Sequence, residues 1–447
     1  MDQGLSADNF RRIWDLRTRR GEDLLAYFPE IEDLTRQIRQ VGVVAGSATS
    51  IERPQAAEDE VGKQLRELRR QRRNELRRQL LELSVKVSTH IDKGTFKFGL
   101  RPGAMIRGRQ TYQIDLADPA VYFTSRQIEW NIRRAFDVRP PNRNLIVEQI
   151  VRTLQDGTPK LIGRTDLRQF YESIQHASLL EFLTASGLLS ATTRRLVKQL
   201  LGEYSAISGR DEGLPRGLAL SATLAEAYLT RMDNELVTMD GVLMYARYVD
   251  DIILIFVDDA FNPSPEYRRK CVRDAVKRSG LSMNAGKTKY LRSPAPAQAT
   301  QHLNFLGYRI SFDATCVTVD ISKKRAGRYQ LKIDAALDAF LLNRADPRAL
   351  SALHQRLKFL TGNTRLVNNK RQALVGSHFS NPLIDKATPE FLKLDRHLAS
   401  RVKTLPIAVK ARTSLELWTF SGGLESRRFH KFSPRQFRQI VAVWKNA

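Results

Sequence analysis

The spacing of apolar residues divides the chain into helical and strand-like stretches. Apolar positions three and four residues apart predict helices, and these fall over 118–155, 170–202, 221–239, 265–280 and most of 323–447. Runs of β-branched and apolar residues predict strands, and these fall at 160–165, 243–257, 287–292, 303–311 and 316–321. A β-hairpin is also expected over 94–116, with its turn at Arg107-Gly108-Arg109.

The N-terminal region has its own pattern. The first 53 residues predict a short helix that is capped near Ala7-Asp8-Asn9 and carries Phe10, Ile13, Trp14 and Leu16. Residues 55–83 predict a long helix with a narrow apolar stripe formed by Leu65, Leu68, Leu76, Leu80 and Leu83. Eight Lys and Arg residues lie between positions 63 and 78. This helix either lies along nucleic-acid phosphates or docks to protein through its leucines, and both interpretations can hold.

Charge adds a partner to this picture. The 447 residues include 73 Lys and Arg against 48 Asp and Glu, a formal net charge of +25. An excess this large favours a polyanionic partner, most often nucleic acid, over a merely basic surface. An anionic membrane is a weaker alternative, because no long apolar segment or lipidation motif is present.

Cysteine usage and the N-terminus point to a reducing compartment. Cys271 and Cys316 are far apart and have no Cys or His at metal-ligand spacing, which argues against a disulfide scaffold or a structural zinc site. The sequence MDQGLSADNF lacks the layout of a signal peptide. We therefore expect a cytoplasmic protein.

The stretch YARYVDDIILIFVDD, residues 245–259, carries two pairs of aspartates around one apolar run. Two strand-like segments separated by two residues predict a tight hairpin with Asp250-Asp251 at its tip. The second pair, Asp258-Asp259, precedes a loop-like segment and is interpreted as a solvated strand end. Adjacent acids in a turn also occur for conformational reasons alone.

Asp166 ends the strand predicted at 160–165 and could by itself be a helix N-cap. Together with Asp250 and Asp251 it suggests another function. Phosphoryl transfer needs charge neutralisation at the attacking and leaving oxygens, which two hard cations held by carboxylates supply. Asp166 and Asp250 are candidates to bridge two Mg²⁺ ions, with Asp251 in support and Mn²⁺ as a possible substitute.

The order of five motifs resembles a reverse transcriptase palm. RTDLRQFYESI contains Asp166, and it is followed by GLPRGLALS, YVDD, GLSMNAGKT and LNFLGY. The resemblance implies an α+β, right-handed polymerase, an RNA-directed DNA polymerase. Its expected parts are a basic helical N-terminal extension, fingers, a palm with an antiparallel sheet and a helical thumb, at 1–93, 94–160, 161–310 and 311–447.

The resemblance also implies roles for individual residues. Asp166, Asp250 and Asp251 are expected to hold the metals, and Lys287 to protonate or neutralise the leaving pyrophosphate, although it could be a surface lysine. Tyr171 falls at the steric-gate position that favours dNTPs, although it could be a core aromatic. The further nucleotide-binding candidates are Leu167, Arg216, Gly217, Arg126 and Arg143. The primer-grip candidates are Phe305, Leu306 and Gly307.

Arg216 departs from the family pattern, because many reverse transcriptases carry Gln there. A guanidinium at this position is expected to add charge near nucleotide or template phosphates. It could favour an unusual template, restricted nucleotide choice or protein-assisted synthesis.

The chain is also similar to bacterial defence-associated reverse transcriptases, most of all to the first of the two polymerases in the type-three antiviral system. SADNFRRIWD, NRNLIVEQI and LKFLTGNTRLVNNKR carry this similarity. It implies a noncoding RNA and a second reverse transcriptase as partners, besides an RNA template, dNTPs and a DNA product. Alternatives are a retron or intron-type reverse transcriptase, an RNA-dependent RNA polymerase, and a non-catalytic RNA-binding scaffold.

Overall fold

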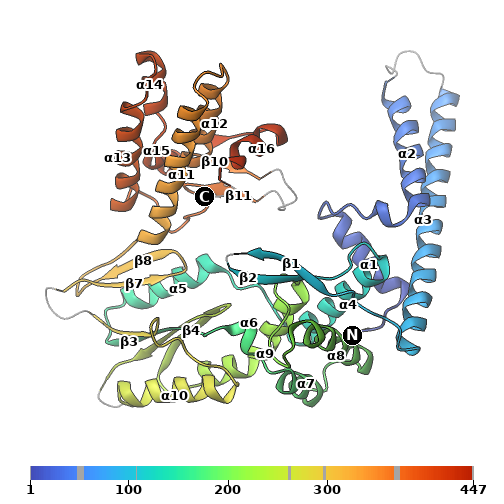
Figure 1. The fold of residues 1–447 in the computed structure, drawn as a ribbon, viewed down its shortest axis with the longest axis horizontal. Helices are drawn as coiled ribbons and strands as arrows, with labels where there is room; N and C mark the ends of the chain where they lie inside the picture. The colour runs from blue at the N-terminus through green and yellow to red at the C-terminus, as the bar shows by residue number, and fades with distance from the viewer. Residues whose placement is uncertain are drawn as a thin grey trace. The chain divides into compact units, whose positions relative to one another are not determined.

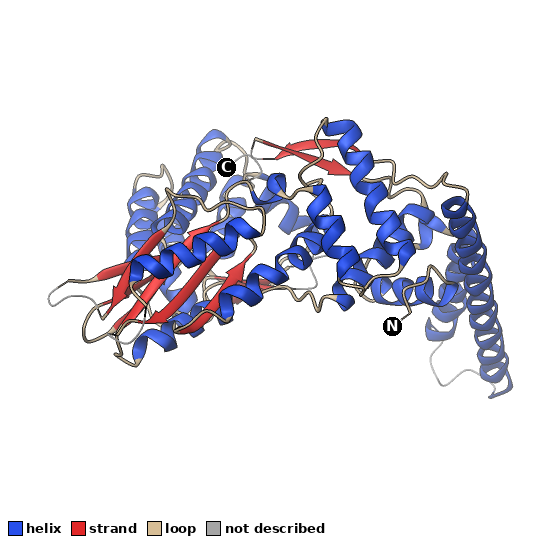
Figure 2. Cartoon of the chain, turned by 90° about the horizontal axis from the view of Figure 1, so that it is seen from below, coloured by secondary structure: helices blue, strands red, loops and turns tan. Residues whose placement is uncertain are grey.

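The computed structural model describes residues 2–47, 55–106, 108–259, 263–294, 299–366 and 373–444. Arg107, at the expected turn of the first hairpin, lies outside these residues. The fold is α+β, as predicted: helices predominate and most strand pairs are antiparallel (Figure 2). No helix in the described ranges is long and apolar enough to cross a membrane.

The chain forms two compact units that interleave in sequence. Unit 1 consists of Met1–Arg139, Arg168–Asn234 and Val276–Ser282, and unit 2 of Pro140–Leu167, Glu235–Ala275 and Met283–Ala447. The limits of fingers, palm and thumb stay predictions.

Unit 1 is mainly helical and contains the β1–β2 hairpin (Figure 1). Its elements are α1 (Ala7–Thr18), η1 (Leu25–Tyr27), α2 (Pro29–Ser47), α3 (Gln55–Asp92), β1 (Arg101–Ile106), β2 (Arg109–Gln113), α4 (Pro119–Ala135), α6 (Phe170–Ser173), α7 (His176–Ala185), α8 (Ala191–Ser208) and most of α9 (Ala219–Val237). The helix predicted over 118–155 is two helices, because Pro140 and Pro141 follow α4 and interrupt it.

Two predictions for the N-terminal region are confirmed with changes. The first helix begins after Ser6, whose Oγ accepts a hydrogen bond from the Asn9 N–H, so Ser6 is the cap. The long helix α3 continues to Asp92 and packs against α1, α2 and α4 (Figure 1). Leu76, Leu80 and Leu83 are buried in this contact. The docking interpretation of α3 is therefore confirmed, and its contact with nucleic acid stays a prediction.

Unit 2 contains the sheets that carry the candidate site. Its elements are α5 (Arg143–Gln155), β3 (Lys160–Asp166), β4 (Val242–Tyr248), β5 (Asp251–Val257), most of α10 (Pro265–Arg278), β6 (Lys289–Ser293), β7 (Gln301–Phe305), β8 (Tyr308–Phe312), β9 (Val317–Ile321), α11 (Lys323–Leu342), α12 (Ala349–Thr361), β10 (Asn363–Arg365), β11 (Leu374–Gly376), α13 (Pro389–Lys403), α14 (Val409–Glu416), α15 (Phe420–Glu425), β12 (Phe429–His430) and α16 (Pro434–Ala442).

A four-stranded antiparallel sheet in the order β4-β5-β3-β6 forms the centre of unit 2. Consecutive residues Ile252 to Phe256 of β5 are all buried. Since successive side chains of a strand point to opposite faces, both faces of β5 are covered. This burial makes β5 a rigid support for the residues at its ends.

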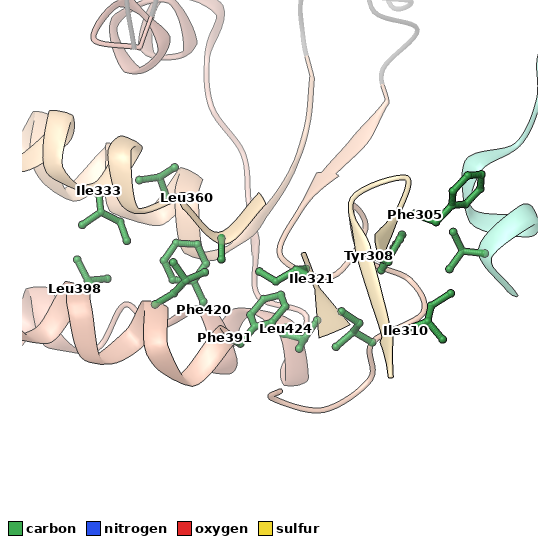
Figure 3. Packing of buried hydrophobic residues seen from close by; sticks show 14 of the residues in the cluster. Phe305, Tyr308, Ile310, Ile321, Ile333, Leu360, Phe391, Leu398, Phe420 and Leu424 are labelled. Carbon is green, nitrogen blue, oxygen red and sulfur yellow. The ribbon is translucent and has the colours of Figure 1, made fainter. Parts of the chain in front are cut away.

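A second sheet, β7-β8-β9, shares one apolar core with the C-terminal helices. Figure 3 shows Phe305, Tyr308 and Ile310 of this sheet in one cluster with Phe391 of α13 and Phe420 of α15. Burying each such side chain contributes about 1.5–3 kcal/mol. The hairpin β7–β8 is therefore anchored to the helical region that follows it.

The C-terminal region is mostly helical, as predicted, but it also contains a small sheet in the order β11-β10-β12. These strands are two or three residues long. Periodicity needs at least four residues to indicate a strand, so the sequence pattern could not reveal them.

Candidate active site

The hairpin between β4 and β5 turns one residue earlier than predicted. Tyr248 pairs with Asp251, so the two turn residues are Val249 and Asp250. Val249 has a φ of 61°, a conformation that is costly for a β-branched residue. Of the two turn residues only Val249 has a positive φ, the sign pattern of a type II′ turn. The prediction that Asp250-Asp251 forms the tip is thus wrong by one position.

This register gives the two aspartates different settings. The backbone carbonyl of Asp250 accepts a hydrogen bond from the Leu167 N–H at 2.9 Å, which ties the turn to the end of β3. Asp251 is the first residue of β5 and pairs directly with Asp166, the last residue of β3. All three carboxylates therefore lie at the same end of one sheet.

The second aspartate pair lies at the opposite end of β5. Asp258 follows Asp251 by seven residues, roughly 23 Å along a strand. Its carboxylate is 2.9 Å from Nε of Arg292, and its side chain is 19% exposed. Asp258 directly follows the last residue of β5 and Asp259 is exposed, which agrees with the interpretation of a strand end. Asp258 itself is only partly solvated, because it pairs with the exposed Arg292.

Lys287 contacts the Asp166 carboxylate. Its Nζ donates to both oxygens of Asp166, at 2.9 and 2.8 Å. The turn that carries Lys287 is itself fixed to Asp166, because the Asn284 N–H donates to the Asp166 carbonyl at 2.8 Å. The lysine side chain is 58% exposed, whereas that of Asp166 is 6% exposed. An exposed and flexible cation thus covers a buried carboxylate.

The carboxyl of Asp250 lies near more negative than positive charge. Burial raises the pKa of the Asp250 carboxyl, the negative charges of Asp166 and Asp251 raise it further, and Lys287 opposes this rise. Mg²⁺ prefers oxygen ligands such as carboxylates, and its charge would relieve the repulsion among these three side chains.

The carboxylates therefore fit such an ion by their chemistry, but protein cations occupy two of them. Lys287 is on Asp166 and Arg164 is on Asp251. Across the described residues, no three His, Cys, Asp or Glu side chains are grouped so that they could hold a metal ion. A metal would have to displace Lys287 from Asp166.

Arg164 is a further residue of the site, and the sequence motifs did not indicate it. Its Nη2 donates to Oδ1 of Asp251 at 3.3 Å, and its guanidinium carbon lies 5.8 Å from the centroid of the Phe305 ring. It thus links one site carboxylate to the primer-grip candidate. The available signal was its position two residues before Asp166 on one strand, because residues i and i+2 share a face.

The candidate primer grip is the turn between β7 and β8. Phe305 pairs with Tyr308, which leaves Leu306 and Gly307 as a two-residue turn. Their φ values are 47° and 83°, the sign pattern of a type I′ turn that favours glycine. The Gly307 carbonyl accepts from the Ser322 N–H at 3.0 Å. The turn is therefore held firmly, while its contact with a primer stays a prediction.

In unit 1, Arg216 forms a two-pronged ion pair with Glu172. Nε and Nη2 of Arg216 donate to the two carboxylate oxygens at 2.6 and 2.9 Å, and the guanidinium carbon lies 4.9 Å from the Tyr171 ring centroid. Burial would raise the pKa of Glu172, but the hydrogen bonds and charge of Arg216, with help from Arg109, lower it. In the structure Glu172 thus balances the charge of Arg216, and the expected effect of that charge on nucleotide or template phosphates stays a prediction.

Gly217 brings the backbone close to β2. Its φ is 98°, and a Cβ placed on it would lie 3.0 Å from the Tyr112 carbonyl oxygen. The Tyr112 N–H in turn donates to the Arg216 carbonyl at 2.7 Å. The positive φ and the close approach explain why glycine is needed here. Contact with a nucleotide stays a prediction.

The two arginines expected to grip a triphosphate are engaged with protein. Arg126 donates to Glu129 at 3.2 Å and stacks 5.3 Å from the Tyr122 ring centroid. Arg143 donates to the Ser380 carbonyl at 3.1 Å and lies 5.0 Å from the Tyr308 ring centroid. Both arginines thus have structural contacts, and their contact with a triphosphate stays a prediction.

The middle of the chain is similar to a known protein family. Residues 127–310 match the family model described as reverse transcriptase (RNA-dependent DNA polymerase). The range includes Asp166, Asp250, Asp251 and Lys287, so these residues lie in the segment that matches the reverse transcriptase family. None of the curated proteins matches the chain.

Solved telomerase structures share weak similarity with the chain. Truncated apo telomerase from Candida tropicalis has 15% identity and a TM-score of 0.33, covering 44% of this chain and 45% of that one. Telomerase from Candida albicans with a fragment of telomeric RNA has 12% identity and a TM-score of 0.31, covering 71% and 53%. The chain thus spans about half the length of these telomerase chains. Because the structural similarities are weak, they support no conclusion about function, and the comparison that bears on function is the family match of residues 127–310.

Proposed function

We propose that this protein is an RNA-directed DNA polymerase that adds dNTPs to a 3′-hydroxyl by two-metal phosphoryl transfer. One observation carries the proposal. Asp166, Asp250 and Asp251 lie at one end of one sheet, inside the segment that matches the reverse transcriptase family.

The proposed chemistry depends on charge. Phosphoryl transfer needs positioning and charge neutralisation rather than a protein nucleophile. Two Mg²⁺ ions, or Mn²⁺ in their place, would be held by Asp166 and Asp250 with Asp251 in support, and would stabilise charge on the attacking and leaving oxygens. The N–H of Leu167 fixes the Asp250 backbone, and Arg164 orients the Asp251 carboxylate.

Lys287 and Tyr171 have separate proposed tasks. The Lys287 side chain is 58% exposed, so it would be able to leave Asp166 if that carboxylate held a metal, and its Nζ would then supply a proton to the leaving pyrophosphate. Tyr171, five residues after Asp166, is proposed as the steric gate against a ribose 2′-hydroxyl. Its position beside Arg216 limits how far the ring can move.

The test removes the two turn-proximal carboxylates. We expect Asp250→Asn with Asp251→Asn to lower primer extension by at least about 10²-fold, because charge stabilisation of the reacting oxygens is lost. RNA binding should stay within about twofold, since few phosphate contacts change. Asp258→Asn, at the far end of the same strand, is the matched control and should retain synthesis. Full synthesis by the double variant would overturn the proposal.

A narrower role is also proposed: a bacterial, cytoplasmic enzyme of antiviral defence that works with a noncoding RNA and a second reverse transcriptase. The N-terminal and C-terminal sequence similarities support it. Purifying the protein with the nucleic acid it carries, sequencing that material, and then supplying each dNTP alone tests this role. Recovery of a retron-type or intron RNA, or of no defined RNA, would favour the alternatives.

A further inference from the structure

We infer that a cavity between α1 and α3 is a phosphate-binding site. The cavity has a volume of about 180 Å³ and is lined by Arg11, Trp14, Asp15, Arg19, Arg72 and Arg73. The lining residues of α1 recur three and four positions apart, and those of α3 follow one another within a single turn. Such spacing places them on facing sides of two packed helices.

The charges around the cavity are unbalanced. Arg11 uses its Nε to pair with both oxygens of Asp15, at 3.1 Å, which neutralises the one carboxylate of the lining. Within the described part of the chain, no carboxylate forms an ion pair with Arg19, Arg72 or Arg73. Three guanidinium groups therefore share a small space that lacks compensating negative charge.

Arg72 is the most telling of these groups. Its Nε is buried and has no hydrogen-bond partner among the described residues. Burial lowers the pKa of Arg72, and the nearby positive charges of Arg11 and Arg39 lower it further. Other arginine Nε atoms of the described residues are also buried without a partner, but Arg72 lines a cavity together with further arginines that form no ion pair. Buried polar hydrogens are normally paired, and in this setting an anion would complete the site.

The shape and chemistry favour phosphate over other anions. Guanidinium groups that line one small cavity suit the oxygens of a tetrahedral phosphate, because a phosphate accepts paired N–H bonds from a guanidinium fork. Buried Trp14 and Leu76 contribute apolar lining to the same cavity. A volume of about 180 Å³ accommodates one phosphate group with its waters but no complete nucleotide.

The phosphate can belong to a nucleic-acid backbone or be a free ion. Exposed Arg69 and Arg77 lie one turn before and after Arg73 on α3. A row of cations at this spacing suits consecutive backbone phosphates. The inference concerns binding alone and does not depend on polymerase activity.

The first arm of the test uses inorganic phosphate as the probe. We expect phosphate to raise the melting temperature of the full chain, and Arg72→Gln to weaken its calorimetric affinity at least tenfold. Arg78→Gln makes the same formal charge change on another face of α3, where Arg78 pairs with Glu75 and Glu82, and should leave the affinity within twofold. Because Arg72 is partly buried, Arg19→Gln with Arg73→Gln repeats the test from exposed positions.

The second arm uses a 20-nucleotide single-stranded RNA at several salt concentrations. A backbone phosphate in the cavity predicts that Arg72→Gln weakens RNA binding and lowers the log–log salt slope by about 0.7. Loss of phosphate binding with unchanged RNA binding would assign the site to free phosphate. The inference is overturned if both cavity variants match Arg78→Gln in both arms. The Asp250→Asn, Asp251→Asn protein serves equally well, so a failed polymerase proposal leaves this result readable.

Discussion

Asp250 and Asp251 are neighbours in sequence, yet their backbones have different tasks. Asp250 sits in a turn that contains a strained valine and is tied to Leu167, while Asp251 is a regular strand residue opposite Asp166. Strained backbone persists only where the surrounding structure enforces it, and such positions cluster at functional sites. This contrast supports Asp250 as the principal ligand and Asp251 as its support.

At the same scale, Tyr171 is expected to control sugar choice. Replacing it by valine should reduce the preference for dNTPs over rNTPs by on the order of 10- to 100-fold, because a bulky ring no longer contacts the 2′-hydroxyl. Single-nucleotide incorporation with each sugar measures this. Tyr171→Phe keeps the ring and should keep the preference. If Tyr171→Val keeps the original preference for dNTPs over rNTPs, Tyr171 is a core aromatic residue and not the steric gate.

The Glu172–Arg216 pair is expected to make stability depend on pH. Because the folded-state pKa of Glu172 is lowered, its contribution is fully present above the ordinary glutamate pKa and is lost as pH falls through the lowered value. At neutral pH, Glu172→Gln should cost at most about 1 kcal/mol, since the pair is partly exposed.

Thermal unfolding of the unchanged protein and of Glu172→Gln from pH 7 to pH 3 measures this contribution. The difference in stability between the two proteins should disappear at the acidic end. Arg216→Gln should show the same loss, and the double variant should be no less stable than either single variant. A difference that is constant with pH would show that the pair contributes no electrostatic stability.

At the scale of elements, the site is formed where strands end. β3, β5 and β7 each contribute one residue to a linked set, in which Arg164 connects Asp251 with Phe305. The buried apolar residues of β5 and the shared core of β7–β9 hold these ends in place. We therefore propose Arg164 as a positioning residue rather than as a group that contacts the reacting atoms.

Replacing Arg164 by methionine should lower primer extension by roughly 10- to 100-fold, because small misplacements of a catalytic group have effects of this size. The loss should fall mainly on kcat, with a smaller change in the KM for dNTP. Arg164→Lys retains the charge and should recover part of the activity. If the lysine and methionine variants lose the same amount of activity, positioning of Asp251 requires the planar guanidinium group. If neither variant loses activity, Arg164 does not have the proposed positioning role.

At the scale of the whole molecule, we expect the net charge of +25 to dominate the proposed association with nucleic acid. Ion pairs within the chain, such as those of Arg78, Arg126 and Arg216, consume part of this charge. The binding charge is therefore expected to concentrate where cations lack carboxylate partners, as around the α1–α3 cavity.

Binding of the full chain to single-stranded RNA should weaken steeply with salt. We expect log K against log salt to have a slope of about −3 or steeper, corresponding to four or more phosphate contacts at about −0.7 each. Fluorescence anisotropy between 50 and 300 mM salt provides the measurement. A slope near zero would mean that the excess charge does not serve nucleic acid.

The sequence by itself determined the elements that depend on local spacing. The long docked helix, the β4–β5 hairpin and the strand that ends at Asp166 all follow from periodicity. The order of the five motifs predicted the similarity to reverse transcriptases that the family match of residues 127–310 shows, because the spacing of acidic residues and loops can be read directly from the sequence.

Only the tertiary structure decided what each side chain contacts. It moved the hairpin turn to Val249-Asp250, paired Arg216 with Glu172 and placed Lys287 on Asp166. It also gave Arg164 a task and left Arg72 with an unpartnered buried nitrogen. The turn depends on the register of two neighbouring strands, which spacing alone did not fix. The contacts of Arg216, Lys287 and Arg164 join residues 40 or more positions apart, and that of Arg72 depends on packing between helices, so local sequence patterns carry no information about them.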